Sequence, residues 1–250
     1  MQKNPCVLWL IWQNQKTRQR YHIGNLFHEN GKYIFLYELS GKRRTLKEAL
    51  ENGYKPHLSF RNLNKTYVSD RLFGPFERRL PDKRRPDFDK ILKNYGLPPD
   101  YTEMDLLRAT GGRLATDPYE FVAPISVFED RFNFDFYIAG WRYYDGEKVI
   151  NQLKEGAAVR FQLEPSNKED EKAVIVLSEK GEYKLGYIPA FYSGFMYEMI
   201  EEHFVYEARI EKVSPMARPQ SKVSISVTGC LANGFFVKNG ENVESVHVLV

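Results

Sequence analysis

The sequence predicts an α+β protein of two domains, a small α+β module followed by a β-barrel. Short apolar runs and helix patterns alternate in the first half, whereas the second half holds six strand-like segments and one helix pattern. Charge divides at the same place. Residues 1–125 carry 22 lysines and arginines against 14 acidic residues, while residues 126–250 carry 14 against 19. We therefore expect domains of residues 1–124 and 125–250.

The first domain is predicted to begin with a small antiparallel meander. Residues 7–12 are continuously apolar, residues 21–26 and 32–37 are rich in aromatic and β-branched side chains, and Asn30-Gly31 is a typical hairpin turn. Helix-start and helix-stop residues then predict helices over residues 45–51, 86–95 and 102–110. The glycines of Gly111-Gly112-Arg113 follow a helix instead of preceding one, so they predict a helix end and not a phosphate loop.

Many short strands plus one helix predict a closed or nearly closed β-barrel for the second domain, because pairing removes the strand edges. The helix is expected over residues 190–202. The expected strands cover residues 134–140, 157–163, 172–177, 183–188, 204–213 and 223–227. Alternating valines predict one further strand within residues 231–250.

Several classes of protein are excluded. The longest apolar run has seven residues, whereas a membrane-spanning helix needs about twenty, and the absence of a signal-peptide pattern favours a cytoplasmic protein. Cys6 and Cys230 stand at opposite ends and are expected to be core thiols, and the five histidines show no ligand spacing. With no phosphate loop or catalytic pattern either, we expect no metal, no cofactor and no enzymatic activity.

Three motifs stand in order in the second half: Arg142-Tyr143, then E-P-S-N-K-E-D over residues 164–170 with Ala173-Val174 after it, then G-Y-I-P over residues 186–189. Together they resemble a HIRAN domain, over about residues 132–229. The resemblance implies an OB-like barrel that holds single-stranded DNA by its free 3′ end. The implied nucleic-acid-binding residues are Arg142, Tyr143, Tyr144, Asn167, Asp170, Tyr187 and Met216.

The residue types suit that function. An arginine beside tyrosines offers a phosphate contact next to a stacking surface, and Asn167 and Asp170 could accept a hydrogen bond from a terminal hydroxyl. The alternative for these two residues is that they only cap and turn their loop. The chain departs from the family pattern at Glu169, where relatives have an aromatic residue, and at Ala190, where they have a basic one.

The first half has a resemblance of its own. Residues 23–26, 73–81 and 106–113 are similar to the N-terminal subdomain of HipA-type toxin kinases, over about residues 5–123. Kinase catalytic motifs are absent, so the resemblance implies docking or regulation and no phosphoryl transfer.

The densest basic cluster offers a candidate surface for nucleic acid or an acidic partner, although Asp82, Asp87 and Asp89 interleave it and favour an ordinary solvated face. Its members are Arg78, Arg79, Lys83, Arg84 and Arg85. The sequence thus predicts a bacterial, non-catalytic protein that engages single-stranded DNA or DNA ends. The alternative is a regulatory partner that docks a HipA-like kinase, as in toxin–antitoxin systems.

Overall fold

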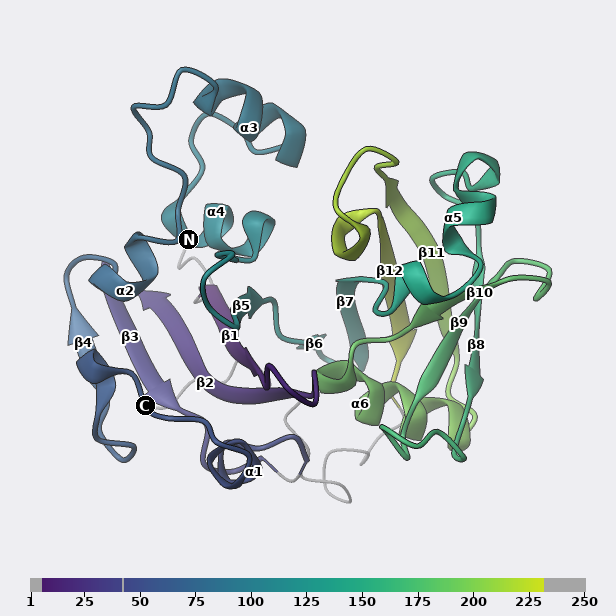
Figure 1. Cartoon of the computed structure of the whole chain (residues 1–250), viewed down its shortest axis with the longest axis horizontal. Coiled ribbons are helices and arrows are strands. Elements are labelled where there is room, and N and C mark those ends of the chain that lie inside the picture. The colour runs from purple at the N-terminus through teal and green to yellow at the C-terminus, as the bar shows by residue number, and fades with distance from the viewer. Residues whose placement is uncertain (1–5, 42, 232–250) are drawn as a thin grey trace. The chain divides into compact units, whose positions relative to one another are not determined.

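A computed structural model describes residues 6–41 and 43–231 of the chain. The chain divides into two units, residues 1–124 and residues 125–250, which we call the N-terminal and C-terminal units. Helices and antiparallel sheets occur in both (Figure 1), as expected for an α+β protein. No described helix is both long enough and apolar enough to span a membrane.

The N-terminal unit is built on a five-stranded antiparallel sheet of order β4-β3-β2-β1-β5. Its strands are β1 (Cys6–Gln13), β2 (Arg20–Glu29), β3 (Lys32–Tyr37), β4 (Tyr67–Ser69) and β5 (Tyr119–Val122). The first three form the predicted meander. Asn30 and Gly31 both have positive φ, at 49° and 73°, and form the two-residue turn between Glu29 and Lys32, because such a turn follows the right-handed twist of its strands.

The helices of this unit are α1 (Leu46–Glu51), η1 (Leu58–Phe60), α2 (Gly74–Glu77), α3 (Phe88–Tyr95) and α4 (Glu103–Thr110). The start residues of two of them act as predicted. The Thr45 side chain accepts from the backbone N–H of Glu48, and Thr102 forms a capping box with Asp105. Helix α4 ends at Gly111 in the left-handed conformation, which confirms that this glycine ends a helix.

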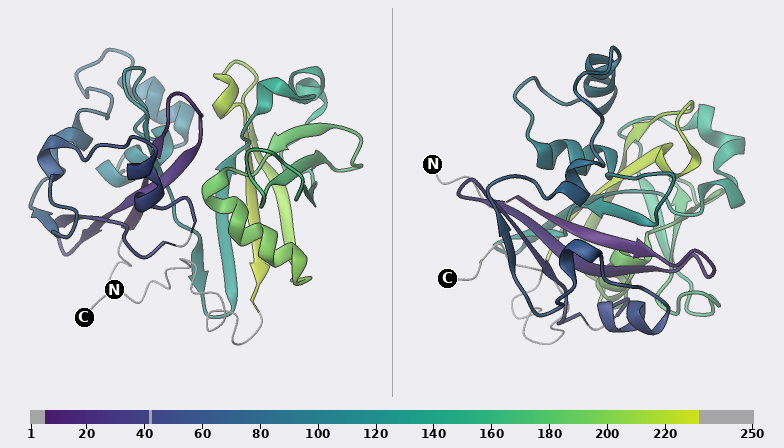
Figure 2. Two further views of the ribbon diagram at one scale, coloured as in Figure 1. Left: turned by 60° about the horizontal axis from the view of Figure 1, so that its bottom comes forward. Right: turned by 60° about the vertical axis from the view of Figure 1, so that its left-hand side comes forward.

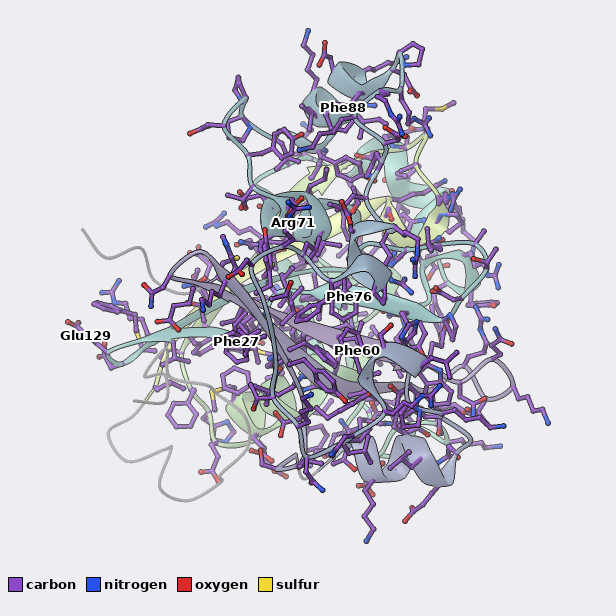
Figure 3. All side chains as sticks on the ribbon, turned by 90° about the vertical axis from the view of Figure 1, so that its left-hand side faces the viewer. Phe27, Phe60, Arg71, Phe76, Phe88 and Glu129 are labelled. Carbon is purple, nitrogen blue, oxygen red and sulfur yellow. The ribbon has the colours of Figure 1, made fainter. Side chains whose placement is uncertain are left out.

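Aromatic side chains fill the core of the N-terminal unit. Phe60 and Phe76 lie stacked with ring centres 5.2 Å apart (Figure 3), and Phe35 and Phe121 pack against Phe76 at 5.3 and 5.0 Å. Phe88 lies well away from them, on α3, where it contacts Tyr101 instead. The segment that carries α3 therefore stands outside the main core.

The C-terminal unit contains two antiparallel sheets, one of order β10-β9-β8 and one of order β11-β12-β7-β6. The strands are β6 (Ser126–Phe128), β7 (Arg131–Tyr137), β8 (Val159–Leu163), β9 (Val174–Ser178), β10 (Lys184–Tyr187), β11 (Tyr206–Val213) and β12 (Val223–Cys230). The helices are η2 (Trp141–Tyr143), α5 (Gly146–Val149), η3 (Ile150–Gln152), α6 (Ala190–Glu201) and η4 (Pro219–Ser221).

Helix α6 covers the aromatic face of β7. Alternation along β7 buries Phe132, Phe134 and Phe136 on one side. Two rings of α6 meet this row, Phe195 against Phe132 and Tyr192 against Phe134, each with ring centres 5.0 Å apart. Figure 2 shows α6 lying across the strands at this face.

Of the predicted closed or nearly closed barrel, the described residues form two antiparallel sheets and no closed barrel. The two sheets meet at two corners through isolated bridges, Ala139 with Tyr187 and Ala158 with Arg209, and not through continuous ladders. The first corner stays short because β7 ends at Tyr137 and Gly140, at φ 74°, turns the chain into η2. The further strand predicted within residues 231–250 lies outside the described residues from 232 onwards.

The prediction of two core thiols was wrong for Cys230, whereas Cys6 packs against the core of the N-terminal unit. Cys6 is half-buried and Cys230 is exposed, and both are free.

Candidate functional site

Three segments that are distant in sequence supply six of the seven predicted nucleic-acid-binding residues: η2 with the residue after it, the loop between β8 and β9, and the end of β10. A pair of backbone hydrogen bonds joins the first and third segments. Ala139 and Tyr187 each donate their N–H to the other's carbonyl, both at 2.9 Å. This corner fixes the start of η2 beside the end of β10.

Gly186 permits that close approach. Its φ is 147°, and a Cβ atom at this position would lie 2.3 Å from the Ala139 carbonyl oxygen and 2.6 Å from Ile138 Cγ2. The pairing register of β10 also shifts between Lys184 and Gly186. Residues three apart on a regular strand face opposite sides, but a bulge adds one residue and reverses that relation. Lys184 and Tyr187 thus reach the same group.

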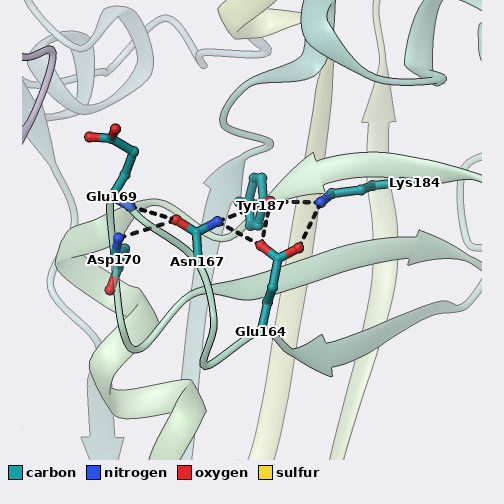
Figure 4. Close-up of polar contacts among 6 residues, drawn as sticks. All are labelled: Glu164, Asn167, Glu169, Asp170, Lys184 and Tyr187. Carbon is teal, nitrogen blue, oxygen red and sulfur yellow. Dashed lines mark hydrogen bonds and ion pairs between the residues drawn. The ribbon is translucent and has the colours of Figure 1, made fainter.

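That group is the carboxylate of Glu164, just beyond the end of β8 (Figure 4). Its Oε2 accepts from the Tyr187 hydroxyl and from Asn167 Nδ2, both at 2.6 Å, and its Oε1 lies 3.3 Å from Lys184 Nζ. The Tyr187 hydroxyl in turn accepts from Lys184 Nζ at 2.6 Å and from Asn167 Nδ2 at 3.1 Å. We call these four residues the Glu164 network.

The ionisation of the network follows from these contacts. Burial alone would raise the pKa of the Glu164 carboxyl, but the hydrogen bonds from Asn167, Tyr187 and Lys184 outweigh it and hold that pKa below its usual value. Burial, and then the hydrogen bond to Glu164, raises the pKa of the Tyr187 hydroxyl. At neutral pH the network therefore contains a carboxylate and a protonated phenol.

Asn167 and Asp170 shape the loop between β8 and β9. Asn167 Oδ1 accepts from the backbone N–H groups of Glu169 and Asp170, at 3.0 and 3.2 Å. The Asp170 carboxylate accepts from the backbone N–H of Lys172 at 2.9 Å and from the Ser193 hydroxyl of α6 at 3.0 Å. Both residues thus cap and turn their loop, as one of the two interpretations of the sequence predicts. Their role in recognising the 3′ end of a DNA strand stays a prediction.

The aromatic residues form two groups. Tyr144 and Tyr187 meet edge to face with ring centres 5.4 Å apart, and Lys184 Nζ lies 4.5 and 4.3 Å from those centres. Arg142 and Tyr143 instead contact each other, with the guanidinium carbon 4.7 Å above the tyrosine ring. The Tyr143 side chain is largely exposed, at 69%.

Met216 stands apart from these contacts. It lies in the loop between β11 and η4 and is 99% exposed. The structure thus brings Tyr144, Asn167 and Tyr187 into one contact network, links Asp170 to Asn167, and pairs Arg142 with Tyr143.

Glu164 and Lys184 were missed as site residues by the sequence analysis. Glu164 is the first residue of the E-P-x-N motif, but the motif by itself assigns no binding role to it. Lys184 was not predicted as a site residue because residues three apart on a regular strand face opposite sides of the sheet, which would separate it from Tyr187. The glycine at position 186 was the available signal, since a glycine inside a strand often marks a bulge.

The predicted basic cluster of the N-terminal unit does not form one exposed surface. Arg79 has a side chain only 7% exposed, and it pairs with both carboxylate oxygens of Asp117 and donates to the Gly112 carbonyl at 3.0 Å. The other members, Arg78, Lys83, Arg84 and Arg85, are exposed. Arg84 and Arg85 pair with Asp82 and Asp87, so part of this positive charge is neutralised locally.

Within residues 6–41 and 43–231, no group of three or more His, Cys, Asp or Glu side chains is arranged to hold a metal ion.

Comparison with known families identifies the segment that carries the site. The model of the HIRAN domain family matches residues 131–229, from the start of β7 into β12. Residues 131–229 form a HIRAN domain. All seven predicted nucleic-acid-binding residues lie within it, as does the Glu164 network.

Two crystal structures show similarity to the chain. A protein from Lactobacillus plantarum is 19% identical, with 39% of this chain and 92% of that chain covered, at a TM-score of 0.34. The HIRAN domain of human HLTF is 16% identical, with 39% of this chain and 72% of that chain covered, at a TM-score of 0.30. None of the curated proteins matches the chain. These comparisons give no support to a HipA-like N-terminal half.

Proposed function

We propose that the HIRAN domain of this chain binds single-stranded DNA at a free 3′ end, and that it does so without catalysis. The observation that carries this proposal is the exposed pair of Arg142 and Tyr143 within the matched segment. A guanidinium beside an exposed aromatic ring offers one contact for a phosphate and one for a base, which is the combination that single-strand binding uses.

The remaining residues fit separate roles in this proposal. Tyr144 and Tyr187 present ring edges and faces around the Lys184 ammonium, and Met216 is exposed and can pack on a base. The Asp170 carboxylate is held in place by hydrogen bonds from the Lys172 N–H and the Ser193 hydroxyl. In this proposal the carboxylate accepts a hydrogen bond from the terminal hydroxyl of a bound strand, whereas a terminal phosphate would meet like charge.

The alternative, docking of a HipA-like kinase through the N-terminal unit, has no such support. No comparison favours it, and the basic cluster that suggested a partner surface loses Arg79 to an internal ion pair. Single-strand binding is the function that the described residues favour.

A titration with labelled oligonucleotides tests the proposal. Fluorescence anisotropy would compare one short single strand carrying a 3′ hydroxyl, the same strand carrying a 3′ phosphate, and a hairpin whose only single-stranded tail ends in a free 5′ terminus. We expect tightest binding to the 3′ hydroxyl and a strong decrease with salt. Equal binding to all three would leave general strand binding only, and no binding to any would refute the function.

A further inference from the structure

We propose that Glu164 and Lys184 are positioning residues that give this HIRAN domain its preference for a free 3′ hydroxyl. The inference rests on the proposed function, because it concerns how the same site discriminates between strand ends. It is carried by the Glu164 network and by the turn that this network holds (Figure 4).

The orientation of the Asn167 amide depends on the Glu164 network. Both of its donor hydrogens point into the network, toward Glu164 Oε2 at 2.6 Å and the Tyr187 hydroxyl at 3.1 Å. Its oxygen faces the opposite way and accepts two backbone N–H groups. If the amide were reversed, its oxygen would face the carboxylate and its NH₂ would face two donors, so all four contacts would be lost. Glu164 Oε2, as an acceptor, therefore fixes the orientation of this amide.

The Asn167 amide in turn positions Asp170. The oxygen of Asn167 holds the backbone of residues 169 and 170, and this sets the point from which the Asp170 side chain starts. From the other side, Ser193 and the Lys172 N–H hold the carboxylate itself. Asp170 is thus held from two directions, and one of these depends on Glu164.

Lys184 offsets the negative charge of Glu164. A carboxylate beside a nucleic-acid site would repel phosphate, but Lys184 Nζ lies 3.3 Å from Glu164 Oε1 and offsets its charge. The side chains of Lys184 and Glu164 are 25% and 27% exposed, so solvent only partly screens either charge. Lys184 therefore lets the domain keep an anion that orients Asn167 without driving the strand away.

The alternative is a structural ion pair that only stabilises the domain. The two interpretations differ in whether substitutions at these residues change the relative affinity for the two kinds of strand end. A glutamine at position 164 can accept from Asn167 and Tyr187 through its one oxygen, but its NH₂ then faces the Lys184 ammonium, donor against donor. Replacing Lys184 with methionine as well removes this conflict, so the double variant should recover what the single variant loses. The free energy of unfolding would show the same non-additivity for a purely structural ion pair, because residues in contact are coupled, so the affinity ratio for a 3′ hydroxyl over a 3′ phosphate is the quantity that distinguishes the two.

The experiment compares wild type, Glu164→Gln, Lys184→Met and the double variant, all in the full chain. Glu207→Gln is the control, because Glu207 of β11 also forms an ion pair within this domain, with Arg209, and contacts none of the residues that hold Asp170. Two quantities are measured: amide hydrogen exchange at Glu169 and Asp170 by NMR, and the ratio of affinities for strands with a 3′ hydroxyl and a 3′ phosphate.

In Glu164→Gln we expect faster exchange at both amides and an affinity ratio reduced by about tenfold, the effect of one lost charge-assisted hydrogen bond. Binding to the 3′-phosphate strand should change little, because Arg142 and Tyr143 are untouched. The double variant should regain much of the amide protection and of the affinity ratio, and Glu207→Gln should match wild type.

Unchanged exchange in Glu164→Gln would overturn the inference, as would faster exchange with an unchanged affinity ratio. Additive losses in the double variant would also overturn it. If wild type itself shows no preference for the 3′ hydroxyl, the proposed end recognition fails, while the exchange data still decide separately whether Glu164 orients the turn.

Discussion

The guanidinium carbon of Arg142 lies 4.7 Å from the centre of the Tyr143 ring, and both side chains are exposed. A cation–π pair at an exposed position contributes little to folding. Because neither group is part of the core, substitutions here should separate binding from stability.

Tyr143→Ala should weaken binding of single strands by about 1 to 3 kcal/mol, the value of one stacked base, whatever the chemistry of the strand end. Arg142→Ala should weaken binding as well and reduce the slope of log affinity against log salt by about 0.7, one phosphate contact on a single strand. Anisotropy titrations at several salt concentrations measure both effects.

Phe128→Ala is the matched control, since Phe128 is an aromatic residue of the same unit with 71% exposure and lies outside the HIRAN match. If Phe128→Ala weakens binding as much as Tyr143→Ala, the stacking site is elsewhere.

Asp170→Asn should abolish the preference for a 3′ hydroxyl over a 3′ phosphate. Asparagine has nearly the same shape and can still accept the Lys172 N–H, but it removes the negative charge that opposes a terminal phosphate. Affinity for the 3′-phosphate strand should rise while affinity for the 3′-hydroxyl strand stays similar or falls. A variant that keeps the wild-type preference would show that Asp170 only turns its loop.

Gly186→Ala should destabilise the C-terminal unit by about 1 to 3 kcal/mol from overpacking, in addition to the conformational cost of its positive φ. Gly181→Ala is the control, because Gly181 also has positive φ, at 79°, but no atom lies within 4 Å of a Cβ built there. Urea denaturation followed by circular dichroism gives both values. Equal losses in the two variants would mean that the approach of Ala139 imposes no steric limit.

Arg79→Met should lower the free energy of unfolding of the N-terminal unit by about 2 kcal/mol, less than for a fully buried ion pair because Asp117 keeps 27% exposure. Arg84→Met should leave the thermal midpoint unchanged, since the Arg84 side chain is 90% exposed. Differential scanning calorimetry compares the two. Similar midpoints for both variants would contradict an internal role for Arg79.

Residues 125–250 expressed alone should give a soluble protein that melts cooperatively, because this segment has its own sheets and its own helix-covered core. Calorimetry and heteronuclear NMR would check it. A product without dispersed amide signals would refute independent folding.

Local patterns were sufficient to predict much of the secondary structure. Thr45, Thr102 and Gly111 mark helix ends through contacts with their own neighbours, and alternation along β7 reflects burial of one face. Strands β4 and β6 were missed because three residues are too few to show a period of two.

Pairing between distant segments could not be predicted in the same way. Alternation says that a strand has one buried face, but not how many residues it pairs with at each edge, so a barrel was expected where Ala139 and Tyr187 form a single bridge. Similarly, Arg79 is one of several adjacent arginines in the sequence, and only the fold places Asp117 within its reach.

The corner between Ala139 and Tyr187 determines which positions of this site can tolerate substitution during evolution. Its two hydrogen bonds join main-chain atoms only, so they determine where residue 187 lies and leave the identity of its side chain open. The identity of residue 186, in contrast, is restricted to glycine, because a Cβ atom there would collide with the Ala139 carbonyl oxygen. Positions 184 and 187 can therefore acquire new side chains by mutation while the scaffold persists, and a library randomised at these two positions with Gly186 fixed is a direct route to altered ligand preference.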